Sequence, residues 1–283
     1  MNTNRIKLFQ GEAALVLTAL LGFALAAFCG VWTLLYGGEI GAEGDVSKAF
    51  SFNAALGIFL LSTAAVAPYS ALGAKGRAFF RWSYILIALY AYFAETVQNF
   101  RGVNPRFTQD GSAFNAAVAS GFALVALLLV LFYILFAVSF FVPKAYKKDP
   151  LLVLSVRYAA IAIMISFAAG IWISLNGGRY TGLSGNLIWL HGLGFHALQA
   201  VPFAAWLAAR KNLSKREAAV RVHWTGIAYI LGLAAVGWQT MLGVTVLQWS
   251  ALPLAALVCF IAAAVPVVQM LAAAKKGSYG AAG

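Results

Sequence analysis

Residues 114–142 read FNAAVASGFALVALLLVLFYILFAVSFFV, a stretch without a single Asp, Glu, Lys, Arg or His. A helix needs about 20 predominantly apolar residues to cross roughly 30 Å of hydrocarbon. The stretch is therefore typical of a transmembrane helix, and it is the clearest of several in the chain.

The composition of the whole chain agrees with this. Apolar residues make up 63% and charged residues 10%, whereas a soluble domain has about 45–50% and about 25%. The sequence predicts an all-α integral membrane bundle of eight transmembrane helices, which form a single polytopic domain over residues 1–283. The predicted spans are 13–36, 52–72, 79–99, 114–142, 151–175, 187–208, 222–243 and 247–273.

Basic residues follow the spans in a regular way. They concentrate in alternate loops, such as 73–78, 143–150 and 209–221, on the side that also holds both termini. The positive-inside rule therefore predicts cytoplasmic N- and C-termini. The net charge of +12 suits this orientation and the lipid bilayer as partner. Nucleic-acid binding is not expected, because no soluble segment interleaves basic residues with exposed aromatic ones.

Short similarities recur along the chain. The stretches Phe52–Ala55 and Phe114–Ala117 both read Phe-Asn-Ala-Ala and open two even-numbered spans. The odd-numbered spans end in a polar or amphipathic turn followed by glycine. This pattern predicts four parallel helical hairpins, although interfacial Trp residues and glycine caps recur in many multi-span proteins.

Few polar side chains are predicted at membrane depth, and all lie in the outer halves of their spans. They are Glu95, Gln98, His191, His196, Gln199 and Gln239. Ionisable groups are costly in lipid and commonly mark function. We expect a site in the outer leaflet half in which His191 and His196 bind haem or a transition metal ion. Glu95 would act as a catalytic proton acceptor or as a third metal ligand. The glutamines Gln98, Gln199 and Gln239 would support the cofactor by hydrogen bonds.

The two histidines are five residues apart, about 140° around a helix. They do not form the same-face pair that chelates one zinc ion, so they serve two subsites, or only one of them binds a ligand. Gly192 and Gly194 lie between them and would allow close approach of another backbone or of a flat ligand such as a porphyrin.

The run His191-Gly-Leu-Gly194-Phe-His196-Ala-Leu-Gln199 resembles a motif of a family of uncharacterised bacterial multi-span membrane proteins. Gln98-Asn-Phe-Arg101-Gly102 matches a second motif of that family, Gln-x-x-Arg-Gly. The resemblance implies a bacterial cytoplasmic membrane but no activity. In architecture alone the chain also resembles haem A synthase, with eight spans in four hairpins, but it lacks histidines spread over four helices.

Three functions follow from these features. The first is a haem- or metal-binding, redox-active membrane protein, with a small ligand or an electron-transfer partner at the outer face. The second is a proton-coupled transporter of a small solute, in which Glu95 and the histidines carry protons. The third is a non-catalytic assembly or stress-related partner, in which the polar groups only specify helix packing. No Gly-rich phosphate loop, Gly-x-Ser-x-Gly turn or Asp-rich prenyl-phosphate motif is present in the sequence.

Overall fold

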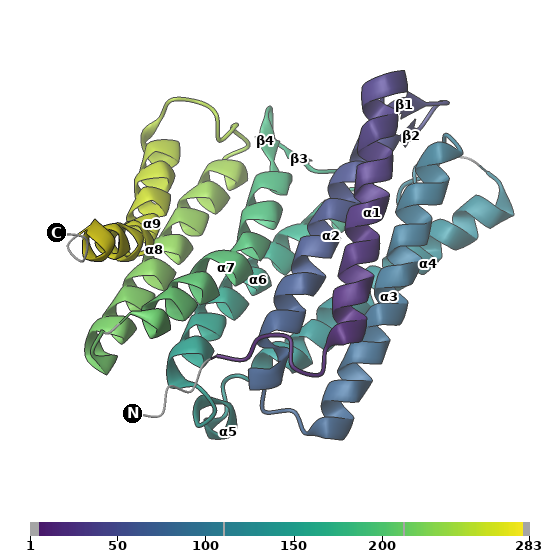
Figure 1. Ribbon diagram of the computed structural model, residues 1–283. Helices are drawn as coiled ribbons and strands as arrows, with labels where there is room; N and C mark the ends of the chain where they lie inside the picture. The colour runs from purple at the N-terminus through teal and green to yellow at the C-terminus, as the bar shows by residue number, and fades with distance from the viewer. Residues whose placement is uncertain (1–5, 110, 212, 280–283) are drawn as a thin grey trace. The chain divides into compact units, whose positions relative to one another are not determined.

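The computed structural model describes residues 6–109, 111–211 and 213–279 (Figure 1). Its long helices are α1 Ala13–Tyr36, α2 Val46–Val66, α3 Ala74–Phe100, α4 Ala113–Val138, α6 Pro150–Leu175, α7 Leu187–Arg210, α8 Lys215–Met241 and α9 Ala251–Tyr279. The short elements are η1 Ala67–Tyr69, α5 Pro143–Tyr146, β1 Glu39–Ile40, β2 Gly44–Asp45, β3 Tyr180–Thr181 and β4 Gly185–Asn186. The predicted all-α class is confirmed.

Helix starts differ from the predicted span limits where polar caps extend a helix beyond its apolar part. Helix α2 begins at Val46 rather than near 52, because the Asp45 side chain accepts a hydrogen bond from the Ser47 N–H. Helix α8 begins at Lys215 rather than near 222, because Ser214 and Glu217 form a reciprocal capping box.

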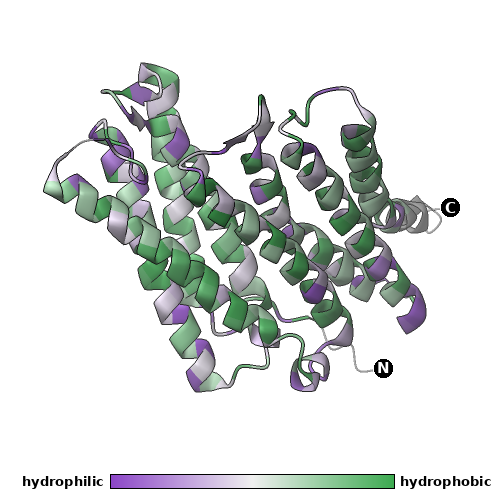
Figure 2. Ribbon diagram, turned by 180° about the vertical axis from the view of Figure 1, so that it is seen from behind, coloured by the Kyte–Doolittle hydropathy of each residue, from purple (hydrophilic) through white to green (hydrophobic). Residues whose placement is uncertain are grey.

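Seven of the described helices are long and apolar enough to cross a membrane, and the chain is accordingly a multi-pass membrane protein. The hydrophobic colour in Figure 2 runs along the helix bodies, and hydrophilic colour gathers near helix ends and in loops. Helix α3 contains the predicted span 79–99 but is not among the seven. Its 27 residues are long enough, but they include Arg81 and Glu95, so the count of eight spans is not confirmed.

The chain forms two compact units. One is Lys7–Ser139, here called the N-terminal unit; the described residues from Phe140 onward form the C-terminal unit. Each unit has the same order of elements: a long helix, a two-stranded hairpin, two long helices and a fourth after a loop (Figure 1). That all of 1–283 acts as a single domain remains a prediction.

From the hairpin to the end of the third helix, equivalent positions in the two units differ by 141 residues, whereas the starts of the first helices differ by 137 and those of the fourth by 138. Helix α2 starts at Val46 and α7 at Leu187; α3 starts at Ala74 and α8 at Lys215. The strand pairs have the same register, since Glu39 pairs with Asp45 in one hairpin and Tyr180 with Asn186 in the other. The chain is therefore an internal repeat of four helices, twice as long as the predicted hairpin repeat.

The repeat extends to individual hydrogen bonds. The Glu43 N–H donates to the Gly102 carbonyl at 3.2 Å, and the Ser184 N–H donates to the Gly243 carbonyl at 2.9 Å. All four glycines at this crossing, Gly41, Gly102, Gly182 and Gly243, have positive φ. Only glycine adopts such backbone readily and lets two chains touch. The first hairpin is thereby fixed to the end of α3, and the second to the end of α8.

The interior of the N-terminal unit is rich in aromatic rings. Phe80 of α3 stacks on Phe136 of α4, with ring centroids 4.4 Å apart. Phe59 of α2 lies 4.9 Å from Tyr133 of α4. In the C-terminal unit, α6 and α7 pack closely at Gly194, where an added Cβ would meet the Ala162 carbonyl oxygen at 2.8 Å. Each unit thus contains close contacts between its helices at these positions.

Candidate functional site

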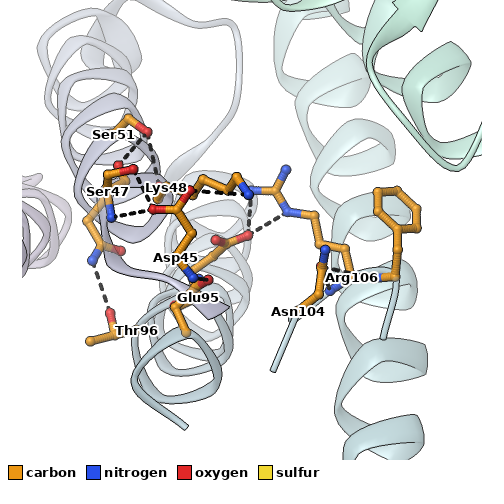
Figure 3. A network of polar contacts seen from close by, with 11 residues as sticks. Asp45, Ser47, Lys48, Ser51, Glu95, Thr96, Asn104 and Arg106 are labelled. Carbon is orange, nitrogen blue, oxygen red and sulfur yellow. Dashed lines mark hydrogen bonds and ion pairs between the residues drawn. The ribbon is translucent and has the colours of Figure 1, made fainter. Parts of the chain in front are cut away.

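Glu95 lies near the C-terminal end of α3, and only 1% of it is exposed. Arg106, in the loop after α3, returns over the helix end to reach it (Figure 3). The Arg106 Nε donates to Glu95 Oε1 at 2.5 Å, and the Nη2 atom forms an ion pair with the same oxygen. A buried carboxylate needs such a partner, because an unpaired charge is costly in an apolar interior.

Aromatic side chains and the first hairpin hold Arg106 in place. Its guanidinium lies over the rings of Phe52 and Phe122, at 5.2 and 5.3 Å from their centroids. The Glu43 carboxylate accepts hydrogen bonds from the backbone N–H groups of Asn104 at 3.2 Å and Gln109 at 2.8 Å. The loop that carries Arg106 is thus fastened to the hairpin.

A second polar group lies on the same end of the N-terminal unit. Gln98 donates to Asn115 Oδ1 of α4 at 3.0 Å, and Arg101 donates to the same oxygen at 2.9 Å. Arg101 also donates to Gln98 Oε1. Gln98 and Asn115 are both buried. These bonds join α3 to α4, so the side-chain amide of Gln98 is hydrogen-bonded within the protein and has a structural role.

Two buried asparagines extend the network toward the hairpin and along α2. Asn99 accepts from the Asp45 N–H at 2.8 Å and donates to the Glu95 carbonyl at 2.7 Å. Asn53 donates to Thr96 Oγ1 at 3.0 Å. Its Oδ1 atom is buried and has no hydrogen-bond partner among the described residues. Sequence reasoning missed Arg106 and Asn99 as partners of Glu95, and it missed Asn53 and Asn115 as buried polar residues bonded to Thr96 and Gln98.

The predicted histidines lie on α7 of the C-terminal unit and have different partners. His191 Nδ1 is 2.8 Å from the Ser166 carbonyl oxygen of α6. His196 is exposed and its Nδ1 lies 3.0 Å from Gln199 Oε1. A backbone carbonyl oxygen only accepts, so in His191 the proton lies on Nδ1, whereas the role of His196 Nδ1 depends on its tautomer. The neutral His191 imidazole then carries its lone pair on Nε2.

Gln239 has a local structural role. It is 4% exposed near the end of α8 and its Nε2 donates to the Thr245 carbonyl at 3.1 Å. Its backbone carbonyl also accepts from the Val244 N–H at 3.4 Å. Gln98 occupies the equivalent position in the N-terminal unit, where its carbonyl accepts from Val103. Both glutamines therefore lie at the turn that ends the third helix of their repeat.

The predicted site residues are divided between the units. Glu95 and Gln98 belong to the N-terminal unit; His191, His196, Gln199 and Gln239 belong to the C-terminal unit. Within the latter, His196 and Gln199 contact each other, while His191 contacts α6 and Gln239 the loop after α8. Over the described part of the chain, no group of three or more His, Cys, Asp or Glu residues is arranged to hold a metal ion. The convergence of all six residues remains a prediction.

Comparison of the two units separates shared from unique polar residues. The glutamine pair and the four crossing glycines are shared. Glu95, however, is equivalent to Val236, and Asn53 to Gly194. His191 and His196 are equivalent to Phe50 and Ala55. The same helical frame forms without these polar groups, so the frame does not require them.

The C-terminal unit also contains a cavity of about 260 Å³ between α7, α8 and α9. Its lining is apolar except for Thr225 and Tyr229. None of the six predicted site residues lines it.

Comparison with known proteins adds no assignment. No protein-family model, curated protein or solved structure matches this chain. The arguments below therefore depend on its own residues.

Proposed function

We propose that the protein is a proton-coupled transporter of a small solute in a bacterial cytoplasmic membrane, with both termini cytoplasmic. One observation carries this proposal: a fully buried carboxylate, Glu95, paired to the loop arginine Arg106, at a position where the other unit has Val236. Ionisable groups at membrane depth are characteristic of proton-carrying sites.

The geometry supports a simple coupling step. With Glu95 ionised, its charge holds Arg106 and the attached loop closed over the helix end. With Glu95 protonated, the attraction is lost and Arg106, whose side chain is 36% exposed, becomes available to a solute. Release of the proton restores the ion pair. The loop position and the protonation state of Glu95 are thereby linked.

Purified protein in liposomes with an entrapped pH-sensitive dye tests the proposal. A panel of amino acids, carboxylates, phosphate and sugars is added outside, and solute-dependent proton entry is recorded. We expect one solute class to drive proton entry and Glu95→Gln to abolish it. Glu39→Gln is the matched control, because Glu39 is exposed in the hairpin. If no solute in the panel moves protons, or if both variants behave alike, the proposal is wrong.

A second candidate is haem or metal binding at the histidines. It is favoured by the hydrogen bonds on both Nδ1 atoms, because histidine ligands commonly donate that proton to an oxygen and bind the metal through Nε2. His191 and His196 would each provide a single ligand, and Gln199 would orient His196. A bound haem would supply electron transfer.

The optical spectrum of the detergent-purified protein tests this second candidate. A Soret band that is lost in His196→Ala or His191→Ala, and retained in His223→Ala, would support it. A spectrum without haem absorbance would contradict it if the wild-type protein also contained no more metal than the His191→Ala and His196→Ala variants. If both candidates fail, the polar groups serve helix packing or assembly alone.

A further inference from the structure

Helix α3 carries one inward line of residues, here called its polar face, that is polar at every position except one. The residues at this face follow the helical spacing of three and four: Arg77, Arg81, Tyr84, Ala88, Tyr92, Glu95 and Asn99. From Tyr84 to Asn99 all of them are buried. Arg81 and Glu95 are fourteen positions apart in the sequence, which corresponds to about 21 Å along the axis. The face therefore extends across most of a bilayer's hydrocarbon thickness.

The equivalent face of α8 is apolar at most positions. It consists of Ala218, Val222, Thr225, Tyr229, Leu233, Val236 and Thr240, and all seven are buried. The same four-helix frame thus packs with Val and Leu where α3 has arginine, tyrosine and glutamate. Burying a polar group costs stability unless it is hydrogen-bonded, and the equivalent face of α8 shows that the frame itself does not require the polar residues of α3.

Each end of this face carries a carboxylate and guanidinium groups. At one end Glu95 pairs with Arg106. At the other end Glu12, which is fully buried before α1, pairs with Arg77 at 3.2 Å and Arg81 at 2.9 Å. One carboxylate facing two guanidinium groups leaves a net positive charge. The positions equivalent to Arg77 and Arg81 in the C-terminal unit, Ala218 and Val222, are uncharged.

Between the two ends lie buried polar atoms without partners. Tyr84 Oη and Tyr92 Oη have no hydrogen-bond partner in the described residues, and neither has Asn53 Oδ1 at the Glu95 end, where the Asn53 amide donates to Thr96. Leaving such an atom without a hydrogen bond destabilises the folded state. Tyr133 of α4 lies beside Tyr84, with ring centroids 6.2 Å apart. Hydroxyl groups of this kind can donate to an anion or to water molecules that accompany it.

We infer that the polar face of α3 conducts a small anion through the N-terminal unit, between the Arg106 site at one end and an Arg77–Arg81 site at the other. This inference rests on the proposed function and names its solute class, because guanidinium groups bind carboxylate and phosphate in preference to neutral or cationic solutes. A proton on Glu95 and an anion on Arg106 together carry no net charge through the apolar bundle.

Cysteine accessibility tests the route without any transport assay. In a full-length Cys29→Ser, Cys259→Ser background, Ala88→Cys places a small thiol midway along the polar face. Tyr92→Cys provides a second position. Leu233→Cys is the matched control, because it is equivalent to Tyr92 on α8. Leu86→Cys serves as a lipid-facing control on α3, where Leu86 is 68% exposed.

Each folded variant is treated with an anionic and a cationic methanethiosulfonate reagent, and each rate is divided by the reagent's rate with free glutathione. We expect both polar-face cysteines to react, with the anionic reagent favoured by about tenfold, since a positive site concentrates anions. Leu233→Cys and Leu86→Cys should remain unlabelled. Arg77→Gln with Arg81→Gln should remove the anionic preference, whereas the exposed Lys144→Gln should not.

Two results would overturn the inference. If the cysteines in Ala88→Cys and Tyr92→Cys react as slowly as the one in Leu233→Cys, the polar face is closed to the reagents and has a structural role. Equal corrected rates for the two reagents would show a water-filled route without anion selectivity. If the cysteines are labelled with anionic preference but the proton-flux assay fails, the anion route stands and proton coupling is wrong. Proton flux without labelling would retain the coupling and reject this route.

Discussion

Gly182 and Gly243 meet backbone to backbone where the second hairpin crosses the end of α8. A Cβ added to Gly182 would lie 2.6 Å from the Gly243 Cα, and Gly182 has a φ of +52°. Gly41 and Gly102 make the same crossing in the N-terminal unit. The close approach therefore belongs to the repeated frame and does not depend on either candidate site.

Gly182→Ala should destabilise the protein by about 1–3 kcal/mol, because a side chain at this φ is strained and collides with Gly243. Thermal unfolding in detergent, followed by circular dichroism, measures the effect. Gly178→Ala is the control, since nothing lies within 4 Å of its Cβ position. If Gly182→Ala and Gly178→Ala lowered the unfolding temperature equally, the close contact between Gly182 and Gly243 would be contradicted.

The two glycines between the histidines should differ in the same way. A Cβ on Gly194 would meet Ser166 Cβ at 2.7 Å, whereas a Cβ on Gly192 meets nothing within 4 Å. We expect Gly194→Ala to lower the unfolding temperature and Gly192→Ala to leave it unchanged. If Gly192→Ala instead reduced haem or metal content, a ligand would lie against that position.

The two single substitutions in the Glu95–Arg106 pair should differ in how much they lower the free energy of unfolding. Arg106→Gln leaves a buried carboxylate without its partner and should cost about 3–5 kcal/mol near neutral pH. Glu95→Gln should cost less, because Arg106 is partly exposed and can reach water. The double variant should be more stable than Arg106→Gln alone, and the Arg106→Gln defect should shrink as the pH falls and Glu95 becomes protonated. Additive effects in this double-mutant cycle would mean that the two side chains do not interact.

The cap of α2 gives a pH-dependent prediction. Burial raises the pKa of Asp45, but hydrogen bonds from Ser47 and the charge of Lys48 outweigh this and hold it below the ordinary value of 3.8. A carboxyl with a lowered pKa in the folded state stabilises above its unfolded pKa and loses that effect as the pH falls. The contribution should be complete above pH 3.8 and decline below it.

Asp45→Asn tests this, because asparagine is the residue at the equivalent cap, Asn186. The variant should keep the cap hydrogen bond, but it should not show the loss of stability below pH 3.8 that protonation of Asp45 causes in the wild type. Asp45→Ala should lose about 1 kcal/mol at neutral pH. Unfolding temperatures of the three proteins across this pH range measure the difference, and identical pH profiles for wild type and Asp45→Asn would contradict the assignment.

Much of the fold could be predicted from the sequence. Long uncharged stretches such as 114–142 define helices whatever their neighbours, because apolar length alone decides membrane insertion. The sequence also predicts a span at 79–99, but α3 is not among the seven apolar helices, because Arg81 and Glu95 lower its mean hydropathy. The caps of α2 and α8 were not anticipated, because they lie outside the apolar runs from which span limits are read.

The candidate site was only partly predictable. Glu95 is identifiable as a carboxylate within an apolar stretch, but its partner Arg106 lies in a loop whose path no periodicity reveals. The repeat of four helices was obscured because apolar residues interchange freely on lipid-facing surfaces. Its signal lies instead in Gly-x-x-Gly-Asp at Gly41–Asp45 and Gly-x-x-Gly-Asn at Gly182–Asn186, which the structure connects to the glycine crossings.

The repeated order of elements bears on how such a chain could originate. Head-to-tail joining of two copies of one four-helix segment would produce two halves with the same order of helices and the same hairpin register in a single step. The two copies would then be free to diverge, one acquiring charge along its third helix and the other acquiring imidazoles on its second.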